Sequence, residues 1–189
     1  GQIRSAISSI ISQYLGANKL QEVKSLPAQA IAIIVVLSLL VIAISYPFSE
    51  QIFKFYNASD AILTYCINYY NIRIFGFPFS LFTFAVFGVF RGLQNTYYPM
   101  LIAITGALLN IVLDFAFVYG VEGFIPAMYI EGAAYASVTA QVTMAAMATF
   151  LLLKKTTIPL KLETKIHPEI KRLLGMILNL FVRTLALNL

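Results

Sequence analysis

The stretch 99–120, PMLIAITGALLNIVLDFAFVYG, decides the fold class of this chain, because it is long enough and apolar enough to cross a lipid bilayer. An α-helix rises about 1.5 Å per residue, so these 22 residues extend about 33 Å. The hydrocarbon core of a bilayer is about 30 Å thick. The stretch is therefore predicted to be a membrane-spanning helix.

This predicted span carries a polar stripe. Gly106, Asn110 and Asp114 follow one another at intervals of four residues, so they lie on one face of the helix. An aspartate deep in a membrane costs about 2.5–3.5 kcal/mol on insertion scales, and it is expected to face protein or a water-filled cavity. The functional interpretation is a proton or cation site. The alternative is a carboxyl group that neighbouring side chains satisfy for packing alone.

The composition of the chain agrees with a membrane protein. Of its 189 residues, 60% are hydrophobic and 11% are charged, whereas ordinary globular chains carry about 25% charged residues. The predicted fold class is all-α, a polytopic helical bundle in a membrane. The net charge of +5 does not indicate a nucleic-acid partner, because most basic residues lie between the apolar stretches.

Side chains that would indicate an enzyme are scarce. The one cysteine, Cys66, has no second cysteine for an internal disulfide. The one histidine, His167, stands in a polar linker and is predicted to be a solvated loop residue. The sequence shows neither a Cys/His metal spacing nor a nucleophile motif, so we expect no enzyme activity, no cofactor and no metal centre.

Other stretches complete the predicted bundle. The chain begins without an initiator methionine and in what reads as the middle of a helix, so we expect a fragment of a longer protein. The predicted elements are half a span at 3–15, a span at 28–46, an interfacial segment at 48–60, a long helix at 61–90, a helix at 131–153 and the start of another span at 173–189.

The helix predicted at 61–90 has two halves of different polarity. Tyr69 and Arg73 lie in its polar outer half, and the residues from Phe77 onward are apolar. Gly76 and Pro78 stand between the halves. A proline inside a helix removes one backbone hydrogen bond, so we expect a kink there. Gly76 and Pro78 are candidate hinge residues, and a static bend is the alternative.

The helix predicted at 131–153 is rich in small side chains. Gly132, Ala136 and Ala140 recur every four residues and form one face. Small side chains allow two helix backbones to approach closely inside a membrane. We expect this face to pack against a neighbouring helix.

The basic residues predict an orientation. Nine lie on one side of the predicted spans and Lys54 alone on the other. Loops rich in lysine and arginine face the cytoplasm. The segments 16–27, 91–98 and 154–172 are therefore predicted to be cytoplasmic; their basic residues are Lys19, Lys24, Arg91, Lys154, Lys155, Lys161, Lys165, Lys171 and Arg172.

Three predicted helices each carry two polar residues four positions apart. Counting inward from the outer helix ends at about 1.5 Å per residue puts one member of each pair about 9–12 Å deep and the other about 15–18 Å deep. We therefore expect the pairs to converge on one cavity in the outer half of the bundle. The alternative is that each pair satisfies its own neighbours. The pairs are Tyr69 with Arg73, Asp114 with Asn110, and Ser137 with Gln141.

Several of these residues fall in motifs that resemble a known family. The stretch from Gly76 to Gly120 contains G-F-P, R-G-L-Q-N-T and N-I-V-L-D, which are similar to helices four and five of the multidrug and toxic-compound extrusion (MATE) transporters. The family has a proline where Phe115 stands and often an aspartate where Asn95 stands. The run GAAYAS resembles its sixth helix, and INYYNIRIFGFP resembles its DNA-damage-inducible branch.

This resemblance implies a fold and an activity. The fold has twelve spans in two lobes, of which the chain covers part of the amino-terminal lobe at 1–153, a cytoplasmic linker at 154–172 and the incomplete first helix of the second lobe at 173–189. The activity is export of organic, often cationic, compounds in exchange for H⁺ or Na⁺ across a bacterial inner membrane. The family's cation site corresponds to Asn110, Asp114, Tyr69 and Ser137; Arg73 and Gln141 are cavity candidates.

The expected partners are membrane lipid, small organic substrates and the missing remainder of the transporter. Two other functions stay open. A flippase for lipid-linked oligosaccharide or another amphiphile would favour a large cavity with several arginines. A membrane scaffold that transports nothing would bury and pair Asp114 without a path to solvent.

Overall fold

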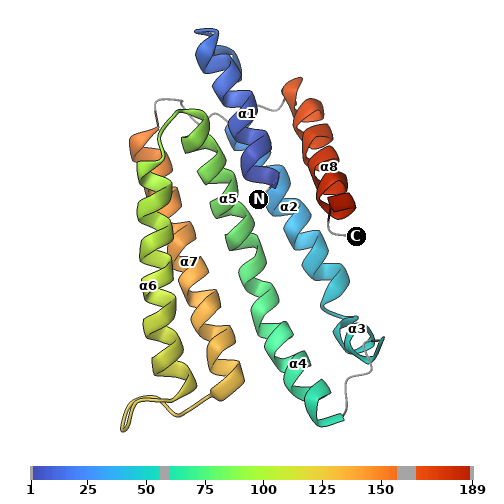
Figure 1. Cartoon of the computed structure of the whole chain (residues 1–189), viewed down its shortest axis with the longest axis vertical. Helices are drawn as coiled ribbons and strands as arrows, with labels where there is room; N and C mark the ends of the chain where they lie inside the picture. Colours follow the sequence, from blue (N-terminus) through green and yellow to red (C-terminus); the bar gives the residue numbers. More distant parts are fainter. Residues whose placement is uncertain (1, 56–59, 157–164, 188–189) are drawn as a thin grey trace. The chain divides into compact units, whose positions relative to one another are not determined.

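The computed structural model describes residues 2–55, 60–156 and 165–187, and these residues contain helices and no β-strand (Figure 1). The helices are α1 Gln2–Gly16, η1 Leu20–Val23, α2 Leu26–Ser45, α3 Ser49–Phe55, α4 Asp60–Arg73, η2 Ile74–Gly76, α5 Phe77–Gly92, α6 Tyr97–Val118, α7 Tyr129–Lys155 and α8 Glu169–Leu187. Here η1 and η2 are short 3₁₀ turns. The predicted all-α fold is confirmed.

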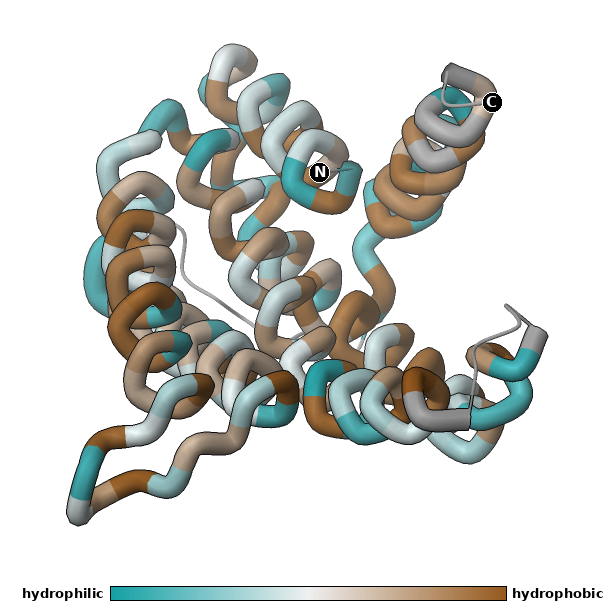
Figure 2. The backbone as a smooth tube through the Cα atoms, turned by 60° about the horizontal axis from the view of Figure 1, so that its bottom comes forward, coloured by the Kyte–Doolittle hydropathy of each residue, from teal (hydrophilic) through white to brown (hydrophobic). Residues whose placement is uncertain are grey.

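Four segments of the described chain are long and apolar enough to cross a membrane, namely Leu20–Ser45, Ile62–Gly92, Tyr97–Val118 and Tyr129–Lys155. Hydrophobic residues recur along their whole length (Figure 2). The predicted polytopic arrangement is therefore confirmed for these four. The helix α8 is not among them and begins at Glu169, four residues before the start predicted for a further span.

Helix α6 has the predicted length of 22 residues but starts two residues earlier than predicted. Asn95 explains the difference, because its side-chain Oδ1 accepts hydrogen bonds from the backbone N–H groups of Tyr97 (3.1 Å) and Tyr98 (3.4 Å). Such a cap satisfies donors that have no partner within the helix. At the other end Gly120 adopts φ +78°, which glycine tolerates readily, and turns the chain away.

The chain forms two compact units. The first comprises residues 1–35, 81–101 and 147–189, and the second comprises residues 36–80 and 102–146. In the first unit α1 packs closely on α5, since a Cβ atom added to Gly92 would lie 2.6 Å from the Cβ atom of Ile11. Small residues therefore bring these two helices together, as they do in membrane bundles generally.

His167 in the first unit lies in the loop before α8, as predicted, but its half-buried ring is hydrogen-bonded. Its Nε2 lies 2.8 Å from the carbonyl oxygen of Glu22, and its Nδ1 accepts the backbone N–H of Glu169 at 3.2 Å. Its own backbone N–H donates to Oε1 of Gln29 at 2.8 Å, and Nε2 of Gln29 donates to the carbonyl oxygen of Lys165 at 2.7 Å. The sequence did not indicate the contacts of His167 with Glu22 and Gln29, because these two partners are distant in sequence.

Replacing His167 by alanine removes both side-chain hydrogen bonds, each worth about 1 kcal/mol. We expect a lower apparent melting temperature in the purified full-length protein. Lys165→Ala is the matched control, because Lys165 contributes only its backbone carbonyl to this network. Equal melting temperatures for the two variants would contradict the structural role of His167.

In the second unit α6 and α7 lie side by side and run in opposite directions (Figure 1). A Cβ atom at Gly132 would overlap the carbonyl oxygen of Phe117, and one at Gly106 would overlap Sδ of Met144. Ala136 and Ala140 on the same face as Gly132 are buried. The close approach predicted for the small-residue face is confirmed.

The two glycines should respond differently to alanine. Gly132→Ala presses a methyl group against a backbone carbonyl, which cannot move without shifting the helix, and overpacking of this kind costs about 1–3 kcal/mol. Gly106→Ala meets a methionine side chain, which can rotate, and alanine gains about 1 kcal/mol of helix propensity. We expect Gly132→Ala alone to lower the melting temperature clearly. A larger loss for Gly106→Ala would contradict this packing.

Candidate functional site

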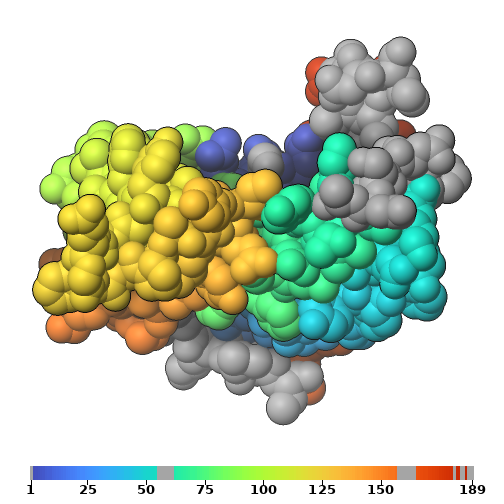
Figure 3. All heavy atoms as spheres, turned by 90° about the horizontal axis from the view of Figure 1, so that it is seen from below, coloured from blue at the N-terminus to red at the C-terminus, as the bar shows by residue number. Residues whose placement is uncertain are grey.

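All eight candidate residues belong to the second unit: Tyr69, Arg73, Gly76, Pro78, Asn110, Asp114, Ser137 and Gln141. Two of their helices, α4 and α7, are joined near the start of α7, where Nδ2 of Asn68 donates to Oε1 of Glu131 at 2.9 Å. Figure 3 views the chain from this end and shows the start of α7 beside the start of α4.

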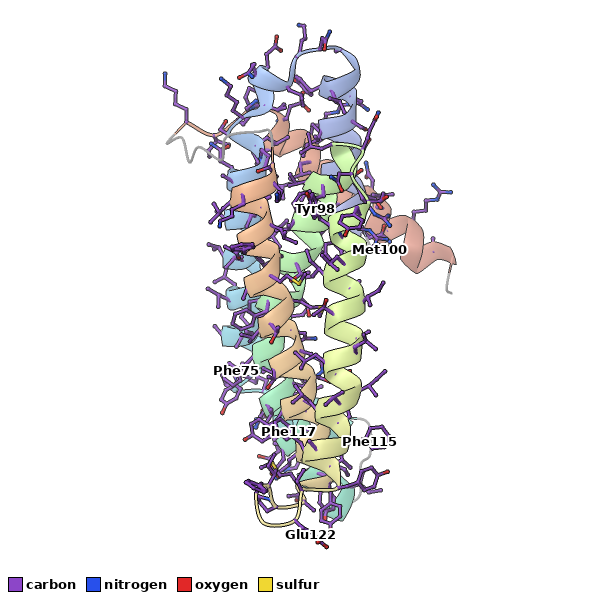
Figure 4. All side chains as sticks on the ribbon, turned by 90° about the vertical axis from the view of Figure 1, so that its left-hand side faces the viewer. Phe75, Tyr98, Met100, Phe115, Phe117 and Glu122 are labelled. Carbon is purple, nitrogen blue, oxygen red and sulfur yellow. The ribbon has the colours of Figure 1, made fainter. Side chains whose placement is uncertain are left out.

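The two faces of α6 differ in exposure. Leu108, Val112 and Phe115 are 60–65% exposed, as residues facing lipid would be. Phe115 projects on the side of α6 away from α7 (Figure 4). Asn110 and Asp114 are half-buried on the other face, in line with the buried Gly106. The polar stripe therefore lies on the protein side of the helix.

The packing of α6 on α7 fixes the level of each polar residue, that is, its position along the helix axis. Counting three residues back from Phe117 and three forward from Gly132 puts Asp114 level with Tyr135. Counting four residues forward from Gly106 and four back from Met144, which are in contact, puts Asn110 level with Ala140. Ser137 is two residues from Tyr135, which marks the level of Asp114. Gln141 is one residue from Ala140, which marks the level of Asn110. At about 1.5 Å per residue both lie within one turn of their expected partners on α6.

Neighbouring side chains do not satisfy Asp114. Across residues 2–55, 60–156 and 165–187, its carboxyl group makes no hydrogen bond and no salt bridge. One turn away, Nδ2 of Asn110 is buried and likewise has no hydrogen-bond partner in this part of the chain. The packing alternative requires partners for the carboxyl group, and no described neighbour supplies one.

Arg73 and Gln141 are brought together as expected. Nη1 of Arg73 donates to Oε1 of Gln141 at 2.8 Å, and both residues line a cavity of about 380 Å³. Tyr69 instead lines a cavity of about 250 Å³ with Tyr65, Cys66 and other residues of α4 and α7. Asn110, Asp114 and Ser137 line neither of these two cavities. The convergence of all three pairs on one cavity stays a prediction.

Sequence analysis missed two polar residues of the larger cavity, Tyr70 and Ser80. Ser80 follows Arg73 by seven residues, which is about two helical turns, so it falls on the same face. That spacing could have revealed Ser80. The break between Arg73 and Ser80 hid it, because helical spacing is not a safe guide across an expected kink.

The predicted break at Gly76 and Pro78 is present. The 3₁₀ turn η2 separates α4 from α5, and Pro78 lies in the first turn of α5, where its missing N–H costs nothing. Gly76 is buried, and a Cβ atom there would overlap Oε1 of Gln141 and lie 3.2 Å from Nη1 of Arg73. Glycine at position 76 therefore makes room for the hydrogen bond between Arg73 and Gln141.

A double-mutant cycle tests this relation. Gly76→Ala should displace Gln141 and lower the melting temperature of the full-length protein, with an unfavourable free energy of about 1–3 kcal/mol. The same change in a Gln141→Ala background should cost much less, because the overlapping atoms are gone. Gly16→Ala is the matched control, since a Cβ atom at Gly16 has no neighbour within 4 Å. Additive effects of the two substitutions would contradict the packing.

Comparison with known proteins places these helices in a family. Residues 2–116 match the sequence model of the MatE family, which is more than half of the chain. The chain belongs to the MatE family. The proteins similar to it include some named multidrug resistance proteins and MATE family transporters, and four of its described helices are long and apolar enough to cross a membrane. It is therefore part of an integral membrane protein.

Two curated relatives match almost the whole chain. DNA damage-inducible protein F of Escherichia coli is 25% identical over 99% of the chain and 40% of its own length. Probable multidrug resistance protein YoeA of Bacillus subtilis is 26% identical over 98% of the chain and 39% of its own length. The MatE chain thus spans about two fifths of the length of these relatives.

Solved structures share its fold. A MATE protein crystallised in complex with MaD3S superposes with a TM-score of 0.85 at 23% identity, over 94% of this chain and 40% of the other. The inward-facing conformation of a multidrug resistance MATE family transporter gives a TM-score of 0.80 at 22% identity, over 94% and 39%. The chain therefore shares the helical membrane fold of these structures. The predicted division into a partial lobe at 1–153, a linker at 154–172 and the first helix of a second lobe at 173–189 stays a prediction.

Proposed function

We propose that the full-length protein exports organic compounds in exchange for H⁺ or Na⁺, and that the coupling ion binds at Asp114. The observation that carries this proposal is the half-buried Asp114 on the protein side of α6, with no partner among the described residues. A carboxyl group held in this way inside a membrane is a functional site by default.

The surroundings of Asp114 suit either ion. A proton requires only the carboxylate group, which becomes a neutral carboxylic acid when the proton binds. A sodium ion requires several oxygen ligands. Ser137 carries a hydroxyl oxygen near the level of Asp114, and Asn110 carries an amide oxygen one turn away on the same face of α6. Tyr69 carries a further hydroxyl, although no contact joins it to Asp114 among the described residues. We assign Asn110, Ser137 and Tyr69 to the site as candidate ion ligands.

Ion binding would act on drug binding through the helices that carry the site. In the proposed cycle of alternating access, neutralising Asp114 changes the packing of α6 on α7 and disfavours bound compound. The 3₁₀ turn η2 is the proposed bend, because Gly76 and Pro78 already interrupt the helix there. The loops that contain most basic residues face the cytoplasm in this proposal; among those residues, Lys161 lies outside the described part of the chain.

Neither alternative function gains support from the site. A flippase would favour a cavity with several arginines, and Arg73 is the one arginine that lines the two described cavities. A scaffold would bury Asp114 and pair its carboxyl group with a neighbouring group. In the structure the side chain of Asp114 is only half-buried and has no partner among the described residues.

Dye efflux from vesicles tests the proposal. We expect Asp114→Asn in the full-length protein to abolish efflux driven by an imposed pH or Na⁺ gradient, because an amide cannot exchange a proton or supply a negative charge. Running the two gradients in turn identifies the ion. Glu122→Gln makes the same chemical change in the exposed loop between α6 and α7 and should retain efflux. Retained efflux in Asp114→Asn would remove this role.

A further inference from the structure

The cavity that contains Arg73 has the size of a small-molecule site. Its volume is about 380 Å³, and pockets for small ligands commonly measure about 300–1,000 Å³. Residues of α2, α4, η2, α5 and α7 line it, and all of them belong to the second unit. The lining residues are Val41, Tyr70, Arg73, Ile74, Phe77, Ser80 and Gln141.

Arg73 is the one charged residue of this lining. A guanidinium group has five N–H donors, and among the described residues Arg73 makes a single hydrogen bond, to Oε1 of Gln141. The three salt bridges of the described residues lie elsewhere, so no described carboxylate neutralises Arg73. Asp114 does not line the cavity. The cavity therefore offers a positive charge and spare donors.

The other lining residues complete the pattern of an amphiphile site. Val41, Ile74 and Phe77 form apolar walls, and the hydroxyl groups of Tyr70 and Ser80 can donate further hydrogen bonds. Guanidinium groups recognise carboxylate, sulfonate and phosphate groups through paired hydrogen bonds. In apolar surroundings such a pair is stronger than in water, because screening is weak.

We propose that this cavity binds organic compounds with one acidic group on an apolar body, the acid on Arg73 and the body against Val41, Ile74 and Phe77. The proposal specifies a substrate class for the export function proposed above and rests on it. It also departs from the cationic substrates that the family resemblance suggests, because the charge of the lining has the opposite sign.

Two fluorescent probes that share an apolar body and differ in one acidic group measure how much that group contributes to binding. 1-Anilinonaphthalene-8-sulfonate carries a sulfonate, and N-phenyl-1-naphthylamine is the same ring system without it. Binding is measured by fluorescence with the full-length protein in phosphatidylcholine nanodiscs, and empty nanodiscs provide the blank. We expect the sulfonate probe to bind the wild-type protein at least about tenfold more tightly than the neutral probe.

Substitutions at Arg73 then test whether this residue causes the preference for the sulfonate probe. Arg73→Gln should remove the preference for the sulfonate probe and leave the affinity for the neutral probe within about twofold. Arg73→Lys should keep part of the preference, because lysine retains the positive charge but not the paired donors. Arg183→Gln makes the same change at an exposed position of α8 and should have no effect. The variant Arg73→Lys also shows that a loss in Arg73→Gln does not come from misfolding.

Three outcomes would overturn the proposal. They are equal affinity of the wild-type protein for both probes, unchanged sulfonate binding in Arg73→Gln, and equal loss of both probes in that variant. The last would show that Arg73 shapes the cavity without recognising an acid, as it would if an acidic residue elsewhere in the full-length protein paired with it. Equilibrium binding needs no ion gradient, so this result is independent of whether Asp114 couples transport.

Discussion

Hydrocarbon cannot solvate a charge or an unpaired peptide group, and the described structure of this chain depends on that constraint. Backbone polar groups in the apolar stretches find partners only within helices, so each of the four candidate spans is helical. The same constraint sorts the side chains of α6, because Val112 and Phe115 lie outward while Asn110 and Asp114 lie on the side of Gly106. Polar side chains on a membrane helix thus face protein, because the surrounding hydrocarbon cannot solvate them.

Glycine sets where the helices of the second unit meet. At Gly132 the absence of a side chain admits the backbone carbonyl of Phe117, and at Gly106 it admits Met144. These two contacts fix the register of α6 against α7 and hence the levels of Asp114 and Ser137. At Gly76 the absence of a side chain admits the amide of Gln141, which holds the guanidinium group of Arg73. Small residues therefore position the polar groups as well as pack the bundle.

The second unit separates two kinds of charge. The carboxyl group of Asp114 lies on α6, and the guanidinium group of Arg73 lies in a cavity formed mainly by α4, α5 and α7. A transporter that exchanges a cation for an acidic compound needs both charges. Because Gln141 and Ser137 lie on the same helix, one turn apart, α7 is the element that connects the two proposed sites.

The sequence by itself determined four of the spans, the break at Gly76 and Pro78, the small-residue face of α7 and the protein-facing side of Asp114. Length, apolar content and helical spacing are local properties, and a membrane permits few structures that satisfy them. Tertiary structure alone decided that the ring of His167 lies beside the carbonyl oxygen of Glu22, and that Tyr69 and Arg73 line different cavities. These relations depend on how separate helices pack and on where a helix is interrupted, and no spacing within one helix contains that information.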